Sequence, residues 1–349
     1  MKKKIDIRQL SLEQLTDEIV KLGEKPYRAK QVHQWLWKKR AIDFDQMTNL
    51  SKSFRKLIEN NFIINALVLS EAQISSDKTI KNAFLLADNS VIEGVLIPTK
   101  KRMTACVSVQ VGCSLDCAFC ATGKLKRIRN LNADEIYDQV VMINDQSQKE
   151  YSIPISNIVY MGMGEPLLNY KNVLLSVDRI TSEDGLGMSA KRITISTAGI
   201  YKKIIRLADD KVKFNLALSL HAANDEKRNK IMPINESNSL NSLKEAMIYF
   251  SEMTGTRPTL EYIIFKDFND EISDAEELVQ FAKSFSSKIN IIEYNSIDEG
   301  KYQQATVKKV DAFASYLESK NLIVNIRRSR GKDIDAACGQ LANKNELAR

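Results

Sequence analysis

Three cysteines stand close together in the sequence, at Cys113, Cys117 and Cys120, within the stretch Cys-Ser-Leu-Asp-Cys-Ala-Phe-Cys. Thiolates are soft ligands that suit iron–sulfur clusters and zinc. Three cysteines can hold three corners of a cubane cluster and leave one iron without a protein ligand, where a small molecule could bind. The spacing therefore predicts a metal centre with one open position.

Zinc is the alternative occupant of this motif. A structural zinc ion normally takes four protein ligands, but the chain has only five cysteines and two histidines, and it has no second pair of closely spaced cysteines. Cys338, far from the motif in sequence, would ordinarily be a buried structural cysteine. Five cysteines are also too few for a disulfide framework in a chain of 349 residues, so we expect a reducing compartment.

A second group of candidate residues follows the predicted strands. Glycines let the backbone approach a ligand closely, carboxylates accept hydrogen bonds from an ammonium group, and hydroxyl and imidazole groups add further partners. Such residues are also common in ordinary turns, so their shared position at strand ends is the stronger argument. We expect His221 to be structural or to contact a ligand rather than to act as a base. The candidates are Gly164, Glu165, Ser196, Ser219, Leu220, His221 and Asn295.

Alternating strands and helices must position these residues. From residue 104 onward, segments with a strand pattern alternate with segments with a helix pattern, which implies a parallel sheet. Six βα units fall short of the eight that close a TIM barrel, so we predict an α/β fold with an open, partial (βα)6 TIM-like barrel, active at the carboxyl ends of its strands. The predicted strands are 104–111, 157–160, 192–196, 214–220, 259–265 and 289–293, and the predicted helices begin near Asn132, Tyr170, Ser239, Ser273 and Val307.

The first ninety residues follow a different pattern. Ser11 can cap one helix and Pro26 can open another. Residues 66–97 then alternate apolar and polar positions, as paired strands do. We predict a small, mainly helical N-terminal accessory domain over residues 1–90, a core over residues 91–331, and a C-terminal segment over residues 332–349 that carries Cys338.

Composition limits the classes of function. With 44% hydrophobic and 27% charged residues, the chain is expected to fold rather than to be disordered. It has no run of eighteen apolar residues and no secretory signal, so we expect a cytoplasmic protein without a membrane partner. The net charge is +7, and residues 1–60 hold 14 basic against 8 acidic residues. A polyanionic partner is compatible with this charge, which is also common among soluble enzymes.

The cysteine motif resembles that of the radical S-adenosylmethionine (SAM) superfamily, in which intervals of three and two residues separate the cysteines and an aromatic residue, here Phe119, often precedes the last. The resemblance implies a [4Fe–4S] cluster on the three cysteines, with the amino and carboxylate groups of SAM on the open iron. One electron then cleaves SAM to a 5′-deoxyadenosyl radical. The resemblance also implies that the strand-end candidates bind SAM, with Gly164 and Glu165 in the loop that binds its amino group.

Residues 327–341, Arg-Arg-Ser-Arg-Gly-Lys-Asp-Ile-Asp-Ala-Ala-Cys-Gly-Gln-Leu, resemble the C-terminal signature of the RlmN and Cfr family of adenine methyltransferases. The resemblance implies that two SAM molecules are used per turnover. One methylates Cys338, and the second supplies the radical that activates this methyl group for addition to an adenine ring carbon. Cys106 then forms a transient disulfide with Cys338, which a thiol reductant resets. Glu93 takes the place of the family's proton acceptor; without the resemblance it would be an exposed strand carboxylate.

The same resemblance implies the partners. RlmN-type members methylate C2 of an adenosine in the peptidyl transferase centre of 23S rRNA and of the adenosine 3′ to the anticodon in tRNA, and such a base must be unpaired or flipped. We also expect an electron donor such as flavodoxin, and a monomer. Trp35 is expected to be buried rather than stacked on RNA. The expected RNA contacts are Lys124, Lys126, Arg127 and Arg129.

Two alternatives stay open. Cfr-type methylation at adenine C8, which confers antibiotic resistance, shares the cysteines and the mechanism, although the loop Met-Gly-Glu165-Pro166-Leu-Leu-Asn resembles RlmN more closely. A noncatalytic iron–sulfur protein that binds RNA would cleave no SAM and would need neither Cys106 nor Cys338. A structural cluster usually takes four protein ligands, however, and this motif supplies three.

Overall fold

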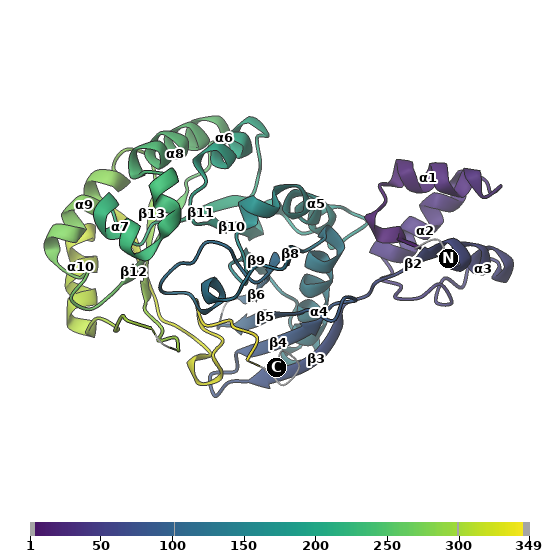
Figure 1. Ribbon diagram of the computed structural model, residues 1–349, viewed down its shortest axis with the longest axis horizontal. Coiled ribbons are helices and arrows are strands. Elements are labelled where there is room, and N and C mark those ends of the chain that lie inside the picture. The colour runs from purple at the N-terminus through teal and green to yellow at the C-terminus, as the bar shows by residue number, and fades with distance from the viewer. Residues whose placement is uncertain (1–3, 101, 299, 345–349) are drawn as a thin grey trace.

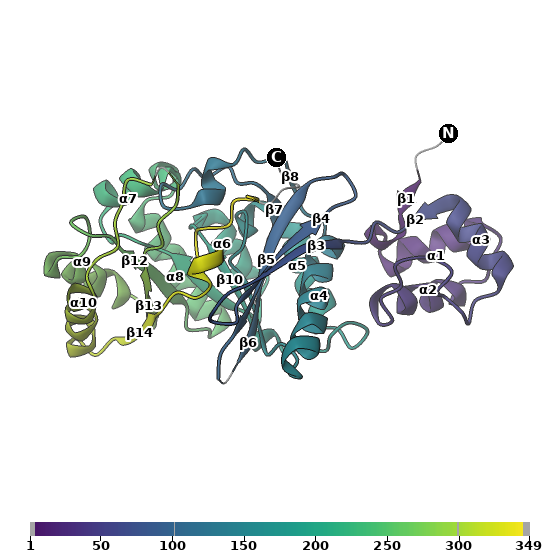
Figure 2. The same cartoon turned by 90° about the horizontal axis from the view of Figure 1, so that it is seen from below.

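The computed structural model describes residues 4–100, 102–298 and 300–344 (Figure 1). A small helical module lies at one end of the molecule, and a larger α/β domain forms the rest. The two parts are separate lobes in both views (Figures 1 and 2). No helix among these residues is both long and apolar enough to cross a membrane.

A sheet of ten strands forms the large domain in the described part of the chain. Seven of its strands run parallel, so their carboxyl ends share one edge, as the predicted α/β partial barrel requires. The sequence predicted six of them. The seventh is an edge strand whose residues are exposed or only half-buried, so it lacks the apolar run of the others. In sheet order they are β6 (Met103–Cys106), β9 (Asn157–Tyr160), β10 (Ile193–Thr197), β11 (Asn215–Ser219), β12 (Thr259–Ile264), β13 (Lys288–Glu293) and β14 (Ile323–Arg327).

Helices follow the parallel strands along the chain and lie outside the sheet (Figure 2). The predicted capping box of Asn132 and Glu135 opens the first of them, and Ser239 caps another by accepting from the N–H of Ser242. The helix expected near Ser273 begins one residue earlier, and two helices were not predicted, α6 and α7. The helices are α4 (Ala133–Tyr151), α5 (Tyr170–Thr181), α6 (Tyr201–Asp209), α7 (Asp225–Ile231), α8 (Leu240–Thr254), α9 (Ile272–Ala282) and α10 (Val307–Ser319).

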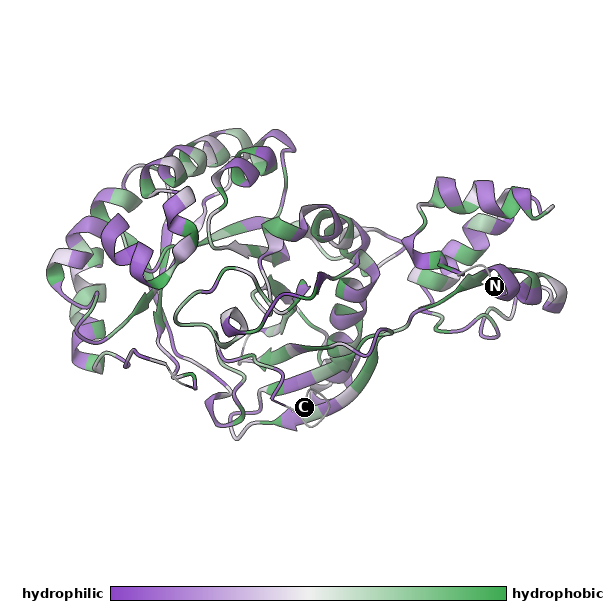
Figure 3. Ribbon diagram, viewed as in Figure 1, coloured by the Kyte–Doolittle hydropathy of each residue, from purple (hydrophilic) through white to green (hydrophobic). Residues whose placement is uncertain are grey.

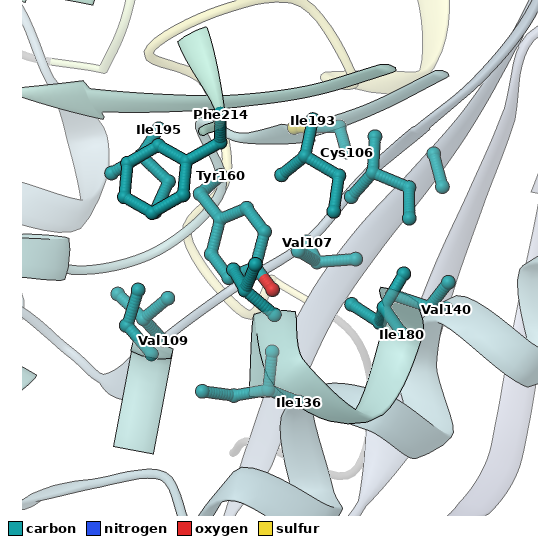
Figure 4. Packing of buried hydrophobic residues seen from close by; sticks show 14 of the residues in the cluster. Cys106, Val107, Val109, Ile136, Val140, Tyr160, Ile180, Ile193, Ile195 and Phe214 are labelled. Atoms are coloured by element: carbon teal, nitrogen blue, oxygen red, sulfur yellow. The ribbon is translucent and has the colours of Figure 1, made fainter. Parts of the chain in front are cut away.

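The main core lies between these helices and the sheet. Figure 3 shows strands that are mostly hydrophobic and helices that alternate hydrophobic and hydrophilic residues, as amphipathic helices on a buried sheet do. Tyr160, Ile195 and Phe214 pack together from the strand side, and Ile136 of α4 and Ile180 of α5 face them (Figure 4). This packing fixes the strands, and therefore fixes where the loops at their carboxyl ends begin.

Three antiparallel strands extend the sheet beyond β6. They are β3 (Val68–Ile74), β4 (Ile80–Leu85) and β5 (Val91–Pro98), paired in chain order up to β6. The strands expected over residues 66–97 are therefore present, but they belong to the large sheet. The boundary placed at residue 90 falls in the turn between β4 and β5, so the structural division between the two lobes comes earlier, between residues 63 and 68.

The N-terminal module is mainly helical, as expected. Its elements are β1 (Ile5–Asp6), α1 (Leu12–Lys21), α2 (Tyr27–Trp37), α3 (Lys52–Asn61) and β2 (Phe62–Ile63), and β1 pairs with β2 in parallel. Ser11 and Gln14 form a capping box at α1, and α2 follows Pro26. The two short strands bring the ends of the module together beside the large domain.

A buried ion cluster joins the module to helix α4. The Arg8 guanidinium donates to Asp138 at 2.8 and 2.9 Å, to Asp134 at 3.2 Å and to the carbonyl of Asn65. The side chain of Arg8 is only 4% exposed, so the carboxylates compensate a charge that water hardly reaches. The edge of the Trp37 ring also packs on Tyr137, with centroids 5.5 Å apart. The relative position of the two lobes therefore depends strongly on Arg8.

Replacing Arg8 with Ala should lower the free energy of unfolding by about 3–5 kcal/mol, because Asp134 would stay buried without its cation. Urea denaturation followed by circular dichroism measures this loss. Arg40→Ala is the matched control, since the Arg40–Asp145 pair spans the same junction at the surface and should contribute about 1 kcal/mol or less. Equal losses in the two variants would contradict the assigned role of Arg8.

Candidate active site

The cysteine motif lies on a loop that follows the first parallel strand, as predicted. A short antiparallel ribbon of β7 (Gln110–Val111) and β8 (Arg129–Asn130) closes this cluster loop, residues 112–128, at its base. Gly112 has a φ of +74°, and a Cβ there would overlap the carbonyl group of Lys126. Only glycine lets the two ends of the cluster loop lie this close.

The three thiols of the motif are enclosed together. Cys113, Cys117 and Cys120 pack on an apolar cluster that includes Phe119 and Phe265. Burial raises the pKa of all three, and the neighbouring thiols raise those of Cys117 and Cys113 further. Thiolates in this position need compensating positive charge, which iron provides.

Main-chain N–H groups point at two of these sulfurs. The backbone N–H groups of Leu115 and Ser114 lower the pKa of Cys113, and that of Gly123, which donates to the carbonyl of Cys120 at 3.1 Å, lowers the pKa of Cys120. Hydrogen bonds of this kind stabilise the thiolate and tune the potential of a bound cluster. The loop therefore supplies both the ligands and part of their electrostatic support.

The C-terminal segment docks on the cluster loop. The N–H of Ala121 donates to the carbonyl of Gly339 at 2.7 Å, and the hydroxyl of Thr122 donates to that of Leu341 at 2.6 Å. Gly339 has a φ of +85°, and a Cβ there would lie 2.9 Å from the carbonyl oxygen of Phe119. The Gly-Gln-Leu sequence after Cys338 is thus the part of the chain that contacts the cluster loop.

The two isolated cysteines come together at this place. Cys106 ends β6 in the buried margin of the core (Figure 4), where the N–H of Met161 donates to its sulfur. Cys338 is exposed at the surface of the site. Burial raises the pKa of Cys106 to about 12 and that of Cys338 to about 11, and the charge of Cys338 adds to the shift at Cys106. The two thiols, 232 positions apart in the sequence, are therefore close enough for a charge on Cys338 to raise the pKa of Cys106.

Arg327, at the end of β14, is a site residue that the sequence did not reveal. Its guanidinium donates to Glu261 at 3.2 Å and lies 3.9 Å from the sulfur of Met161. Its charge lowers the pKa of both Cys106 and Cys338, against the larger effect of burial. The signal available in the sequence was its place as the first residue of the signature 327–341, in which it was assigned no role.

Glu93 is buried, so the alternative of an exposed strand carboxylate is wrong. The residue is 2% exposed because nearly every position of β5 is covered on both faces. One carboxylate oxygen accepts from the N–H groups of Ala342 and Asn343 at 2.9 and 3.1 Å, and the other lies 3.8 Å from the ammonium of Lys81. Burial raises its pKa, which these contacts partly oppose. Glu93 is thus a partly compensated base beside the segment that carries Cys338.

The loop after β9 carries the next candidates. The Glu165 carboxylate accepts from the hydroxyl of Thr197 and the N–H of Ala198, both at 2.7 Å, and burial raises its pKa. Gly164 has a φ of +95°, and a Cβ there would lie 2.5 Å from the side chain of Gln110. Glu165 therefore braces the ends of β9 and β10, and the glycine lets this loop lie against the strand before the cluster loop.

The candidates at β10 and β11 line the same edge. The hydroxyls of Ser196 and Ser219 lie 3.3 Å apart, and Leu220 is fully buried beside them. His221 adopts a φ of +57°, and its Nδ1 accepts from the N–H of Ile263 at 3.1 Å. Burial lowers the pKa of His221 to about 3, so the ring is neutral and carries its hydrogen on Nε2. It can donate a hydrogen bond, but it is a poor base.

The side-chain amide of Asn295, after β13, has a hydrogen-bonded nitrogen and a buried oxygen that no described residue contacts by a hydrogen bond. Its Nδ2 donates to the carbonyl of Cys338 at 3.1 Å, while its buried Oδ1 has no hydrogen-bond partner among the described residues. Gln340 completes the attachment by donating to the carbonyl of Ser296 at 3.0 Å. A buried acceptor without a partner is costly unless a ligand supplies a donor. The residues therefore fit a small polar molecule beside the three thiols, with amino groups that donate to the Asn295 oxygen and ring nitrogens or a carboxylate that accept from His221, as SAM offers.

The expected RNA-binding residues have different surroundings. Lys126 and Arg127 are exposed on the cluster loop, and Lys124 donates to the carbonyl of Asp298. Arg129 instead binds Glu135 at 2.8 Å and Asp88, so its first role is to hold β8. In the N-terminal module, Trp35 is half-buried and Trp37 is buried. Of the four expected RNA contacts, Lys126 and Arg127 are therefore the best placed to face a polyanion.

Comparison with known families covers both lobes. Residues 5–64 match the family described as ribosomal RNA large subunit methyltransferase N-terminal domain, and residues 107–282 match the radical SAM superfamily. A protein of Cytophaga hutchinsonii named probable dual-specificity RNA methyltransferase RlmN is 59% identical over 342 residues, which cover 98% of this chain and 94% of the relative. A protein of the same name from Christiangramia forsetii is 56% identical, with 98% and 97% covered.

A solved structure has the same fold. The crystal structure of a radical SAM methyltransferase from Sphaerobacter thermophilus superposes with a TM-score of 0.90 at 36% sequence identity, covering 97% of this chain and 99% of that one. The likeness therefore includes the N-terminal module and the C-terminal segment as well as the partial barrel.

Replacing Arg327 with Met should raise the pKa of both Cys106 and Cys338, because the cation that favours their thiolates is lost. At a pH below both pKa values, the thiolate fraction, and with it the rate of alkylation by iodoacetamide, falls about tenfold for each unit of pKa. Peptide-resolved mass spectrometry measures the two rates separately. Arg328→Met, which removes a neighbouring cation paired with Glu293, is the control; unchanged rates in Arg327→Met would exclude this electrostatic role.

Proposed function

This chain belongs to the RlmN family of radical SAM RNA methyltransferases, and from that premise we propose that it methylates C2 of an adenosine in the peptidyl transferase centre of 23S rRNA and of the adenosine 3′ to the anticodon in tRNAs. The observation that carries the proposal is the meeting of Cys106, Cys338 and Glu93 beside the three-cysteine motif. These residues come from three separate segments, and no structural need explains why two free thiols and a buried carboxylate should share one place.

The cofactors are those of the family, a [4Fe–4S] cluster and SAM. When bound, they supply both a methyl group and a radical that abstracts hydrogen. Cys113, Cys117 and Cys120 would hold the cluster, and the open groups of His221 and Asn295 would hold SAM, with Ser196, Ser219 and the Gly164–Glu165 loop beside them. In this proposal the three cysteines hold an iron–sulfur cluster and not a zinc ion.

Cys338 acts as the methyl carrier in this proposal. Its thiolate accepts a methyl group from SAM, and the resulting S-methylcysteine remains next to the cluster loop because Gly339 and Leu341 anchor it there. Loss of hydrogen from this methyl group leaves a carbon radical attached to sulfur. That radical adds to C2 of the adenine and joins the base covalently to Cys338. A ring carbon that is not nucleophilic is thereby alkylated without polar attack.

Cys106 and Glu93 complete the reaction. The adduct gives up one electron, which the cluster, left oxidised by SAM cleavage, would accept, and its C2 proton goes to Glu93, whose raised pKa suits a proton acceptor. The thiolate of Cys106 then attacks the sulfur of Cys338, so a disulfide forms while the carbon–sulfur bond breaks and the new methyl group takes up a proton. Two electrons from a thiol reductant return the disulfide to two thiols. The charge of Arg327 beside both cysteines favours the thiolates that these steps require.

RNA would approach over the strand ends. Its adenosine must be unpaired or flipped to reach Cys338, while the N-terminal module and the exposed Lys126 and Arg127 contact the surrounding phosphates. We also propose that the protein is a monomer, that it acts in the cytoplasm, and that it receives electrons from a donor such as flavodoxin. These properties follow the family rather than any contact in the structure.

The test is anaerobic reconstitution with iron and sulfide, followed by reaction with SAM, a reductant and either 23S rRNA fragments or tRNA. Mass spectrometry of the nucleosides should show 2-methyladenosine with the wild-type protein and none with Cys338→Ala. 8-Methyladenosine would instead assign the chain to Cfr-type chemistry. A noncatalytic RNA-binding protein would leave SAM intact, and full methylation by Cys338→Ala would rule out the covalent route.

Cys106, which forms the disulfide that releases the product, gives a sharper prediction. Cys106→Ala should accumulate a covalent adduct between Cys338 and RNA, because the carbon–sulfur bond has no thiolate to release it. Denaturing gel electrophoresis with labelled RNA detects the adduct, which the double variant Cys106→Ala/Cys338→Ala should lack. Free turnover of Cys106→Ala at the wild-type rate would contradict the role of the disulfide.

A further inference from the structure

Arg228, on the short helix α7, is a fully buried arginine next to the cluster loop. Its relative exposure is 0%. Its Nε donates to the carbonyl of Leu220 at 3.0 Å, and one terminal nitrogen donates to the carbonyl groups of Ala198 and Ser219. It thereby ties together the ends of β10 and β11, the two strands that carry Ser196 and Ser219.

No carboxylate forms an ion pair with Arg228 among the described residues. Its other terminal nitrogen donates to the side-chain oxygen of Asn235 at 2.6 Å, and the amide of Asn235 in turn donates to Asp225 at 2.8 Å. The carboxylate of Asp225 is therefore held one residue away from the guanidinium. Burying a cation in this way is costly unless another negative charge compensates it.

The thiolates of the cysteine motif can supply such a charge, because Ile231 at the end of α7 belongs to the apolar cluster on which the three cysteines pack. The N–H of Ala118 donates to the carbonyl of Ile231 at 2.9 Å, which fixes α7 against the cluster loop. Arg228 and Cys117 interact electrostatically, and this interaction lowers the pKa of Cys117. Burial lowers the pKa of Arg228 to about 10, so the guanidinium still carries its charge at neutral pH.

We propose that Arg228 sets the midpoint potential of the [4Fe–4S] cluster by placing a buried cation without an ion-paired carboxylate beside the loop that carries Cys117. Three thiolates give the cluster unit a net negative charge, and reduction adds one more. A buried cation stabilises the reduced form more than the oxidised form, so it raises the potential and makes delivery of the first electron easier. The inference rests on the cofactor of the family and is independent of which RNA carbon is methylated.

A purely structural role is the competing explanation, since Arg228 also holds two strand ends. The two roles predict different effects on the cluster. Loss of the hydrogen bonds alone would change stability and cluster content. Loss of the charge changes the potential of every cluster that does form. Arg228→Gln removes the charge, and Arg228→Lys keeps it while giving up most of the carbonyl contacts.

The experiment is a redox titration of reconstituted protein without SAM or RNA, followed by electron paramagnetic resonance of the reduced cluster. At an ambient potential equal to the wild-type midpoint, the ratio of reduced to oxidised cluster in Arg228→Gln should fall about tenfold, which is about 59 mV for a one-electron couple. Arg228→Lys should stay close to wild type. Lys230→Gln, on the exposed side of the same helix, is the matched control and should leave the potential unchanged.

A charge exchange keeps the proposal testable if Arg228→Gln does not fold. In the double variant Asp225→Asn/Asn235→Asp, the carboxylate moves next to the guanidinium while the net charge and the hydrogen bond between positions 225 and 235 are retained. The reduced fraction should fall in the same direction as in Arg228→Gln. A wild-type midpoint in either folded variant would overturn the proposal, and so would equal shifts in Arg228→Lys and Arg228→Gln.

Discussion

The contact between the cluster loop and the C-terminal segment is the interaction on which the site depends. Two hydrogen bonds carry it, from Ala121 to Gly339 and from Thr122 to Leu341. Both acceptors are main-chain carbonyl groups, so the contact depends on the path of the chain more than on which side chains follow Cys338. The absence of a side chain at Gly339 lets that path come within reach of Phe119. This docking fixes Cys338 relative to the cluster ligands, while the hydrogen bonds from Ala342 and Asn343 to Glu93 fix the same segment relative to β5.

Burial and charge are balanced differently for each reactive group. The thiols have raised pKa values because the interior desolvates them, and Arg327 and Arg228 oppose this from two sides, one beside the cysteine pair and one behind the cluster ligands. His221 is held neutral by the same desolvation. Parallel strands make this possible, because their carboxyl ends bring residues from distant segments to one edge. The parallel sheet therefore holds the reactive groups in place, and the local burial and charge around each group set its pKa.

Much of this arrangement follows from local sequence patterns. The cysteine spacing, the capping box at Asn132 and the alternation of strands and helices are local signals, and each one gave the correct element. Arg228, β14 and the role of Arg327 were missed because their importance comes from contacts across the fold. A buried arginine such as Arg228 is indistinguishable in sequence from a surface one. The boundary at residue 90 failed for a similar reason, since a β-meander continues the sheet without any change in composition.

The anchoring of the C-terminal segment also has a consequence for folding. Asp333 accepts from Ser75 and from the N–H of Ser76, and the first of these contacts joins residues 258 positions apart. Such contacts close the longest loops and are formed late, after the strands between them have paired. The partial barrel can thus be complete while the residues around Cys338 are still detached. Local opening of this segment in the native state would release the methyl carrier and leave the sheet intact, so hydrogen exchange should separate the lifetime of the site from that of the fold.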